Sequence, residues 1–257
     1  MFVIDVPYLN LNKTYDSLQV PRWQKLRDDK YVVIYKDKAL KVEQKKDRLI
    51  MNCSEEEFFE IWFEYFDLKN DYLDLLLKVR RLGGKMKIAA NRGKGIHLIK
   101  HEPFEAYIQS KLVQYVGHEN MGWMINHIAS TCGVKHQQAM REAGRVTWFE
   151  FPTPEMILEN ENRLVLPEKV KAWLHKACSA IVYDSYDIAE NGNDMFKMLC
   201  NNDLSVFPMY DVDSVIERNF KCEPWEFEEL FLGSLKEKGI AYIYILNHIF
   251  NRPKEMK

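Results

Sequence analysis

The side chains that could bind a metal ion or form a disulfide are scattered along the sequence. His118, His127 and His136 recur every nine residues, a spacing that on a helix separates successive members by about 180°. The sequence has no HxH or HExxH motif, and its five cysteines stand far apart without a CxxC pair. We therefore expect no metal site, no cofactor and no disulfide framework, with the cysteines acting as small hydrophobes.

Residues 75–101 form a basic stretch that contains no Asp or Glu. Its cations could contact phosphates, although the solvated face of a loop is the simpler interpretation. Gly-rich phosphate loops are absent, and the only GxG is Gly93-Lys94-Gly95, which argues against nucleotide-triphosphate chemistry. The cations of the basic stretch are Lys78, Arg80, Arg81, Lys85, Lys87, Arg92, Lys94 and Lys100.

The composition is that of an ordinary globular protein. The 257 residues include 36 Lys and Arg against 38 Asp and Glu, which gives a net charge of −2, and 47% of them are hydrophobic. Disordered and collagen-like classes are excluded. No apolar run approaches the ~20 residues of a membrane span, and the first residues lack a secretory pattern. We expect an intracellular, cytoplasmic and nucleoid-associated protein of one large domain or two modest ones.

The elements that must position any site differ between the two parts of the chain. Strands are predicted at 31–37, 39–44 and 47–53 from β-branched and aromatic runs broken by polar turns. Ser54 and Glu57 form a capping box that opens a helix over 56–66, whose many apolar residues predict burial between two layers. A second helix over 70–81 should end at Gly83-Gly84.

From residue 102 onward the pattern predicts mostly helix. Helices should begin at Pro103 and cover 121–133, 154–161, 167–182 and 224–236, the last continuing after a break at Gly239 into 240–250. Trp123, Trp148 and Trp173 are expected in the core. The sequence thus predicts a β-rich N-terminal domain (1–101) and a helical domain (102–257).

Two segments of the first domain resemble a known family. The stretch LNLNKTYDSLQVPRW (9–23) is similar to the opening of the 8-oxoguanine DNA glycosylase N-terminal domain, which carries the motif SGQxFRW. Ser17, Gln19, Arg22 and Trp23 keep that frame. EIWFEYFDLKNDY (60–72) resembles the segment that closes the same domain.

Five later segments resemble the helical part of the same family in the same order. They correspond to the entry into the helical domain, the FPTPE turn, the helix after it, the FPVD element and the final helix. This collinear likeness implies an α+β fold in which an antiparallel β-sheet domain with helices packs on an all-helical glycosylase-like domain, although a shared fold alone does not establish chemistry. The segments are GIHLIKHEPFEAYIQSKL (95–112), FPTPEMI (151–157), VKAWLHKACSAI (170–181), VFPMYDVDSVIERNF (206–220) and LKEKGIAYIYIL (235–246).

The resemblance implies a partner and a reaction. A base-excision glycosylase binds double-stranded DNA, extrudes a modified or damaged base and breaks its N-glycosidic bond. The family's catalytic carboxylate falls on Asp213, with Asp211 as the alternative, and would stabilise an oxocarbenium-like sugar while water attacks. Because DVDSVIE is also typical of a helix start, Asp213 could instead be only an N-cap.

The sequence departs from the family where the helix-hairpin-helix should stand. DMFKMLC (194–200) resembles the helix that leads into the hairpin, yet the chain passes through NNDLS directly to VFP. The hairpin and the nucleophilic lysine that follows it are therefore missing from the sequence, which argues against lyase chemistry. The basic stretch is the candidate substitute for phosphate binding, through Arg80, Arg81, Lys85, Lys87, Arg92 and Lys94.

The base-reading positions also differ from the family pattern. Leu18 stands where a glycine contacts the damaged purine, and Tyr115 falls in the asparagine cluster that fills the vacated duplex site. Tyr242 and Leu246 fall on the Gln and Phe that clamp the base. Together with Trp173 these residues would line the cleft, with Tyr115 as a stacking wedge or a core tyrosine. We expect a substrate other than 8-oxoguanine.

Three functions remain open on the sequence alone. The first is a monomeric glycosylase that hydrolyses the N-glycosidic bond with Asp213 and water. The second is a catalytically inactive DNA-binding or protein-interaction module that kept the fold. The third, which the net charge of −2 leaves open, is a scaffold that no longer meets nucleic acid.

Overall fold

The computed structural model describes residues 1–184 and 235–250, with the side chains of residues 118, 119, 235–238, 242 and 250 left out. Asp211 and Asp213 lie outside the described residues, as does most of the helix predicted at 224–236. No helix within the described residues is long and apolar enough to cross a membrane.

The N-terminal part is built on a five-stranded antiparallel sheet with the order β1-β5-β4-β3-β2. The three predicted strands are confirmed as β3, β4 and β5, whereas β1, β2 and the short helix α1 (Leu11–Asp16) were not predicted. Asp29, Lys36 and Lys46 have left-handed backbones in the tight turns that join the strands. The strands are β1 (Phe2–Asp5), β2 (Gln24–Arg27), β3 (Lys30–Tyr35), β4 (Lys38–Lys45) and β5 (Arg48–Met51).

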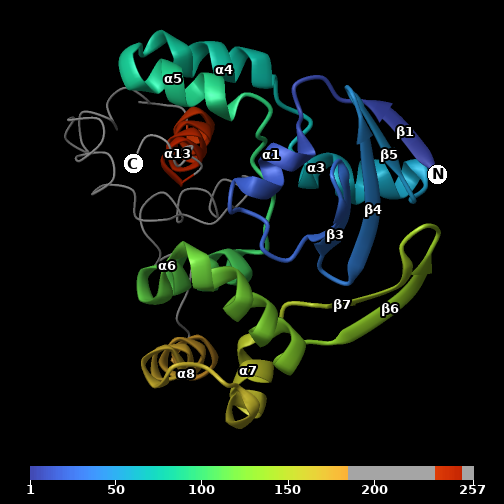
Figure 1. Cartoon of the computed structure of the whole chain (residues 1–257). Coiled ribbons are helices and arrows are strands. Elements are labelled where there is room, and N and C mark those ends of the chain that lie inside the picture. The colour runs from blue at the N-terminus through green and yellow to red at the C-terminus, as the bar shows by residue number, and fades with distance from the viewer. Residues whose placement is uncertain (185–234, 251–257) are drawn as a thin grey trace.

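The strand β3, which lies between β4 and the edge strand β2, is buried on both faces, since all six of its residues are buried. Tyr31, Val33 and Tyr35 pack into the main core of the sheet domain. Val32 and Ile34 point the other way, into a second apolar cluster with Met140, Val146 and Trp148. That cluster is covered by the hairpin of β6 (Lys135–Met140) and β7 (Gly144–Phe149), which runs along the sheet (Figure 1).

This hairpin corrects the expectation of an all-helical second part, while the α+β class is confirmed. The helical pattern ends at Gly133, where a Cβ atom would lie 2.0 Å from the carbonyl oxygen of Glu150. Gly144 then takes a positive φ of 71° at the turn. His136 therefore lies on β6, so the three evenly spaced histidines do not share a helix. Contact with the sheet, which a local pattern does not contain, favours strands here.

The helix predicted over 56–66 is present but interrupted. The Ser54 side chain accepts a hydrogen bond from the Glu57 N–H at 3.1 Å, which confirms the cap. A π-helical turn, η1 (Phe58–Trp62), separates α2 (Glu55–Glu57) from α3 (Phe63–Tyr65). The predicted burial between two layers is wrong, because only one face of the helix is covered: Phe58 is buried while Phe59 is 53% exposed.

The basic stretch forms a helical hairpin. The predicted helix over 70–81 is α4 (Tyr72–Arg81), whose N-cap Asp71 accepts from the N–H groups of Leu73 and Asp74. A second helix, α5 (Gly84–Gly93), follows immediately. The interpretation of the basic stretch as a loop face is therefore wrong as far as Gly93, while residues 94–101 lie outside the helices. Gly83 and Gly84 both have positive φ and supply the turn between the two helices.

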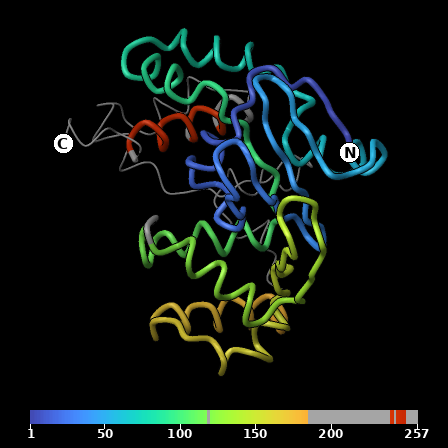
Figure 2. The backbone as a smooth tube through the Cα atoms, turned by 45° about the vertical axis from the view of Figure 1, so that its right-hand side comes forward, coloured from blue at the N-terminus to red at the C-terminus, as the bar shows by residue number. Residues whose placement is uncertain are grey.

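The remaining helices enclose a second core. Gly239 lies inside α13, so the predicted break is absent. Gly93 is required at the α5–α13 contact, because a Cβ there would lie 2.1 Å from Cδ1 of Tyr244. Figures 1 and 2 show α13 beneath the α4–α5 hairpin, with α7 and α8 at the opposite end of the molecule. The helices are α6 (Pro103–Cys132), α7 (Pro154–Asn160), η2 (Glu161–Arg163), α8 (Glu168–Tyr183) and α13 (Leu235–Phe250).

Candidate nucleic-acid interface

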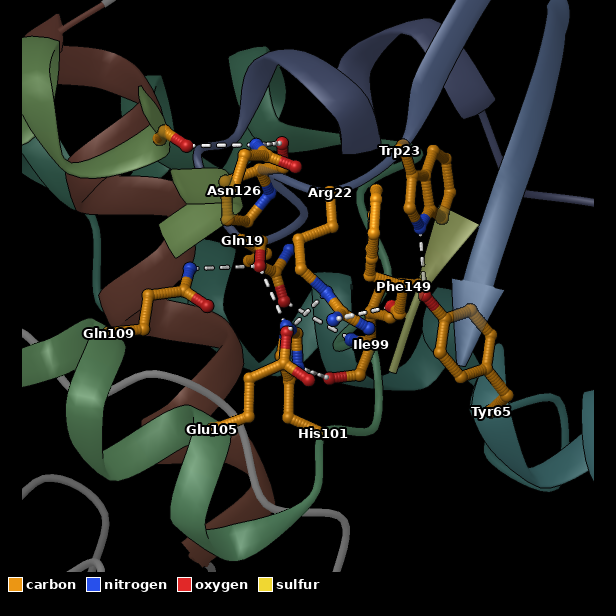
Figure 3. Close-up of polar contacts among 12 residues, drawn as sticks. Gln19, Arg22, Trp23, Tyr65, Ile99, His101, Glu105, Gln109, Asn126 and Phe149 are labelled. Carbon is orange, nitrogen blue, oxygen red and sulfur yellow. Dashed lines mark hydrogen bonds and ion pairs between the residues drawn. The ribbon is translucent and has the colours of Figure 1, made fainter. Parts of the chain in front are cut away.

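The loop after α1 joins the sheet domain to the segment that enters the helical part (Figure 3). Gln19 is fully buried and bonds to that segment like a strand partner. Its Oε1 accepts from the Ile99 N–H at 3.1 Å, and its Nε2 donates to the His97 carbonyl at 3.0 Å and to Ser17 Oγ at 2.8 Å. The loop is therefore held by its own side chains rather than by regular secondary structure.

Arg22 ties three elements together at the same junction. Its guanidinium is 5% exposed, and its Nε lies 2.9 Å from Oε1 of Glu105 on α6. Its Nη1 donates to the Phe149 carbonyl of β7 at 3.1 Å. The neighbouring Trp23 donates from Nε1 to the Tyr65 hydroxyl at 2.7 Å. The motif residues therefore act as the joint between the two parts of the chain.

His101 completes this buried joint. Its Nδ1 lies 2.9 Å from the Ile99 carbonyl oxygen, and its Nε2 lies 2.8 Å from the Gln19 carbonyl oxygen. Burial lowers the pKa of His101, and the nearby Glu105 carboxylate opposes that shift. The ring thus spans from the entering segment to the loop, and both of its nitrogens are occupied by backbone groups.

Leu18 has the backbone conformation of a glycine. Its φ is +68°, in the left-handed region, which costs an L-residue about 1–2 kcal/mol. Its carbonyl accepts a long, 3.4 Å hydrogen bond from Nε2 of Gln109, which also donates to the Gln19 carbonyl at 3.1 Å. The buried hydrogen bonds of Gln19 therefore hold the loop in this turn. The side chain of Leu18 in the turn is half-buried.

The structure brings Tyr115 and Trp173 together. Their ring centroids are 5.5 Å apart with a 34° angle between the planes, so α6 contacts α8 through this pair. Tyr115 is 37% exposed and lies two residues before Gly117, whose φ of 73° kinks α6. The Lys169 ammonium lies 5.4 Å from the Tyr115 ring centroid, a cation–π contact.

The other predicted cleft residues lie on α13. Leu246 is 3% exposed and belongs to the core of the helical part. The side chain of Tyr242 is outside the described set, as are Asp211 and Asp213. The roles assigned to these residues stay predictions.

The α4–α5 hairpin presents the basic side chains at the surface. Arg81, Lys85, Lys87 and Lys94 are exposed, and Arg80 is half-buried. The hairpin therefore offers a helical platform of positive charge, which long-range attraction to phosphates requires.

Arg92 has a different role from the exposed cations of the hairpin. Its half-buried guanidinium has Nη1 at 2.9 Å from Nδ1 of His248 on α13. The Lys13 ammonium donates to the carbonyls of Arg92 and Lys94, at 3.0 and 2.9 Å, and so caps the end of α5. Arg92 therefore helps to hold α5 against α13.

Sequence reasoning missed one surface feature. Trp123 was expected in the core, but it is 57% exposed, whereas Trp148 is buried and Trp173 half-buried. Trp123 lines a groove between α6 and the strands β2, β3 and β7. Helix periodicity places residue 123 next to buried neighbours and so predicts that it is buried too. The groove exists because of where the β6–β7 hairpin lies, which the helical pattern does not contain.

Comparison with known proteins identifies the first part of the chain. Residues 1–107 match the family model described as 8-oxoguanine DNA glycosylase, N-terminal domain. No curated protein matches the sequence.

Solved structures match the chain over nearly its whole length. A Clostridium acetobutylicum 8-oxoguanine glycosylase/lyase in complex with double-stranded DNA containing cytosine opposite 8-oxoG is 18% identical, with a TM-score of 0.71, covering 98% of this chain and 99% of that one. The apo-form of that enzyme is also 18% identical, with a TM-score of 0.70, and the match covers 96% of this chain and 98% of that one. The 3-methyladenine DNA glycosylase of Archaeoglobus fulgidus is 15% identical, with a TM-score of 0.66, and the match covers 97% of this chain and 99% of that one. Residues 1–107 thus match an 8-oxoguanine DNA glycosylase N-terminal domain, and the chain as a whole has the fold of these solved DNA glycosylases.

Proposed function

We propose that this protein binds double-stranded DNA as a monomer and removes a modified base by hydrolysis of its N-glycosidic bond. The observation that carries the proposal is the likeness of fold, over 98% of the chain, to a glycosylase in complex with damaged DNA. The joint formed by Gln19, Arg22 and Glu105 supports this proposal. A cleft between two domains can hold a flipped base only if the two domains keep a fixed relative position.

The exposed cations of the α4–α5 hairpin are the proposed phosphate contacts, in place of a helix-hairpin-helix. Arg81, Lys85, Lys87 and Lys94 would bind directly, while Arg80 and Arg92 support the surface. An attraction of this kind is independent of base sequence and weakens steeply with salt.

The Tyr115–Trp173 pair is the proposed wall of the base-binding cleft. A half-exposed tyrosine next to a kinked helix offers a flat face on which a base can stack, and such stacking is worth about 1–3 kcal/mol. Leu18 and Tyr242 would complete the cleft, with Leu246 behind them in the core. The Leu18 side chain narrows it where the family has glycine, which supports a substrate other than 8-oxoguanine.

In the proposed reaction Asp213 stabilises positive charge on the sugar and orients a water molecule, with Asp211 as the alternative residue. The water oxygen bonds to C1′ as the bond from C1′ to the base nitrogen breaks. The base leaves with the bonding electrons and is protonated, and an abasic site remains. This chemistry needs no lysine nucleophile, so strand cleavage is not part of it.

The second candidate is a glycosylase fold that recognises DNA or a protein without excising a base. The specific observation in its favour is Leu18, which adds a side chain at the backbone position that reads the base in the family. Binding would persist in this case, but no base would be released.

The test is an excision assay on duplex oligonucleotides that carry a panel of modified bases. We expect wild-type protein to release one base and leave alkali-sensitive abasic sites, with release lost in Asp213→Asn and kept in Asp211→Asn. Loss in Asp211→Asn alone would move the catalytic role to that residue. Binding to duplex without release from any substrate would favour the second candidate.

A further inference from the structure

A groove on the surface carries a binding chemistry that the proposed function does not use. It lies where α6 faces the sheet and the β6–β7 hairpin, and its volume is about 310 Å³, at the lower end of the range of ligand pockets. It shares no residue with the predicted cleft. Its lining consists of Arg22, Gln24, Ile34, Trp123, Asn126, His127, Ala129, Ser130, Thr147, Trp148 and Phe149.

The groove contains a preformed stack of two flat rings. The Trp123 and His127 rings lie 5.2 Å apart with only 2° between their planes, one helical turn apart on α6. The His127 Nε2 accepts from the Val165 N–H at 3.0 Å, which fixes the orientation of the ring. Because Trp123 is 57% exposed, its indole offers solvent a large flat surface on which a third ring can stack.

The polar groups around the stack supply both donors and acceptors. Both protons of the Asn126 amide are used, by the Pro21 and Gly122 carbonyls at 2.8 Å, so this side chain offers its Oδ1 as an acceptor. Thr147 Oγ1 accepts from Gln137 Nε2 at 3.2 Å and keeps its own proton as a donor. A flat heterocycle with mixed donor and acceptor edges matches this set.

The charges of the groove favour a neutral recognition element. Arg22, at its floor, is already paired with Glu105 at 2.9 Å (Figure 3). No Asp, Glu or Lys lines the groove within the described residues. An anion or a cation would therefore have no counter-charge in the groove. A neutral ring avoids the cost of burying an unpaired charge.

We propose that this groove binds a nucleobase, stacked on Trp123 and hydrogen-bonded by Asn126 and Thr147. The base could belong to a free nucleoside or to a DNA strand, which share this chemistry. The site is separate from the proposed excision cleft, so it would hold a second base rather than the one that is removed.

The test is titration of the full chain with each of four nucleosides, with a short single-stranded oligonucleotide and with methyl glucoside as the carbohydrate control. Intrinsic fluorescence and calorimetry would follow binding. We expect saturable binding of at least one nucleoside or of the oligonucleotide. Trp123→Ala should weaken it about 5- to 150-fold, and Trp123→Phe should restore most of it.

Tyr183→Ala, which removes an aromatic side chain that is 74% exposed on α8 and outside the groove, is the matched control and should bind like wild type. Equal affinity per base for nucleosides and oligonucleotide assigns the site to free bases, and tighter oligonucleotide binding assigns it to a strand. The proposal is overturned if neither binds, if Trp123→Ala binds like wild type, or if only the glucoside binds. Asp213→Asn should leave this binding unchanged, which separates it from the excision proposal.

Discussion

The ion pair between Arg22 and Glu105 should be one of the most costly interactions to break in this protein. The two side chains are 5% and 11% exposed, and their Nε and Oε1 atoms lie 2.9 Å apart at the joint between the sheet domain and α6. Loss of one partner leaves the other as an unpaired charge in a buried place. Such a loss costs about 3–5 kcal/mol, whereas replacement of both charges by apolar groups is often close to neutral.

We therefore expect Glu105→Leu and Arg22→Met each to lower the free energy of unfolding by about 3–5 kcal/mol. The double variant Arg22→Met/Glu105→Leu should lose far less than the sum of the two, because it removes the unpaired charge. The Phe149 carbonyl, which accepts from Arg22 at 3.1 Å, loses its partner in both Arg22 variants, so a residual loss of about 1 kcal/mol should remain.

The assay is urea unfolding followed by tryptophan fluorescence and by circular dichroism, with the four proteins compared as a double-mutant cycle. Asp5→Asn, which breaks the exposed Asp5–Arg48 pair, is the control and should change stability by less than about 1 kcal/mol. Additive losses in the cycle, or single losses no larger than that of the control, would refute the account of the joint.

Three further outcomes follow from individual residues. Burial lowers the pKa of His97 to about 4, so the unfolded chain takes up the proton first as the pH falls, and about 3 kcal/mol of stability should be lost between pH 6.5 and 4. Between pH 7.5 and 4.5, His97→Gln should lose less unfolding free energy than the wild type, and an equal loss would contradict the lowered pKa of His97. Gly93→Ala should cost about 1–3 kcal/mol in urea unfolding, because its Cβ would overlap Tyr244; a stabilised variant would contradict this packing. Lys85→Gln/Lys87→Gln should lower the slope of log duplex affinity against log salt by about 1.8 without changing stability, and an unchanged slope would exclude both as phosphate contacts.

Features with a local physical cause were predictable from the sequence. Ser54 caps its helix because a hydroxyl three residues before Glu57 reaches that N–H without help from the rest of the chain. The strands β3, β4 and β5 follow from β-branched runs and short turns. The end of α4 follows from the two glycines after it.

Features that depend on distant contacts were not predictable. The β6–β7 hairpin exists as strands because Met140, Val146 and Trp148 cover the outer face of β3, more than 100 residues earlier in the chain. The left-handed backbone of Leu18 is imposed by the buried bonds of Gln19 to residues 97–99. No pattern around either segment contains those partners.

The candidate site was predictable only in part, for the same reason. Tyr115 and Trp173 were assigned to one cleft from the family resemblance, and the structure brings their rings together. Trp123 was assigned to the core because helical spacing alone does not distinguish a buried face from a face that borders a groove.

The central claim is that the protein releases a base by hydrolysis and forms no covalent bond to DNA. The most direct measurement is a single-turnover reaction on the modified-base panel, with the released base identified by mass spectrometry and borohydride present to trap any imine. We predict a free base, alkali-dependent strand breaks and no trapped protein–DNA complex. A trapped complex, or strand breaks without alkali, would contradict the hydrolytic mechanism, and no released base from any duplex would contradict the assignment as an enzyme.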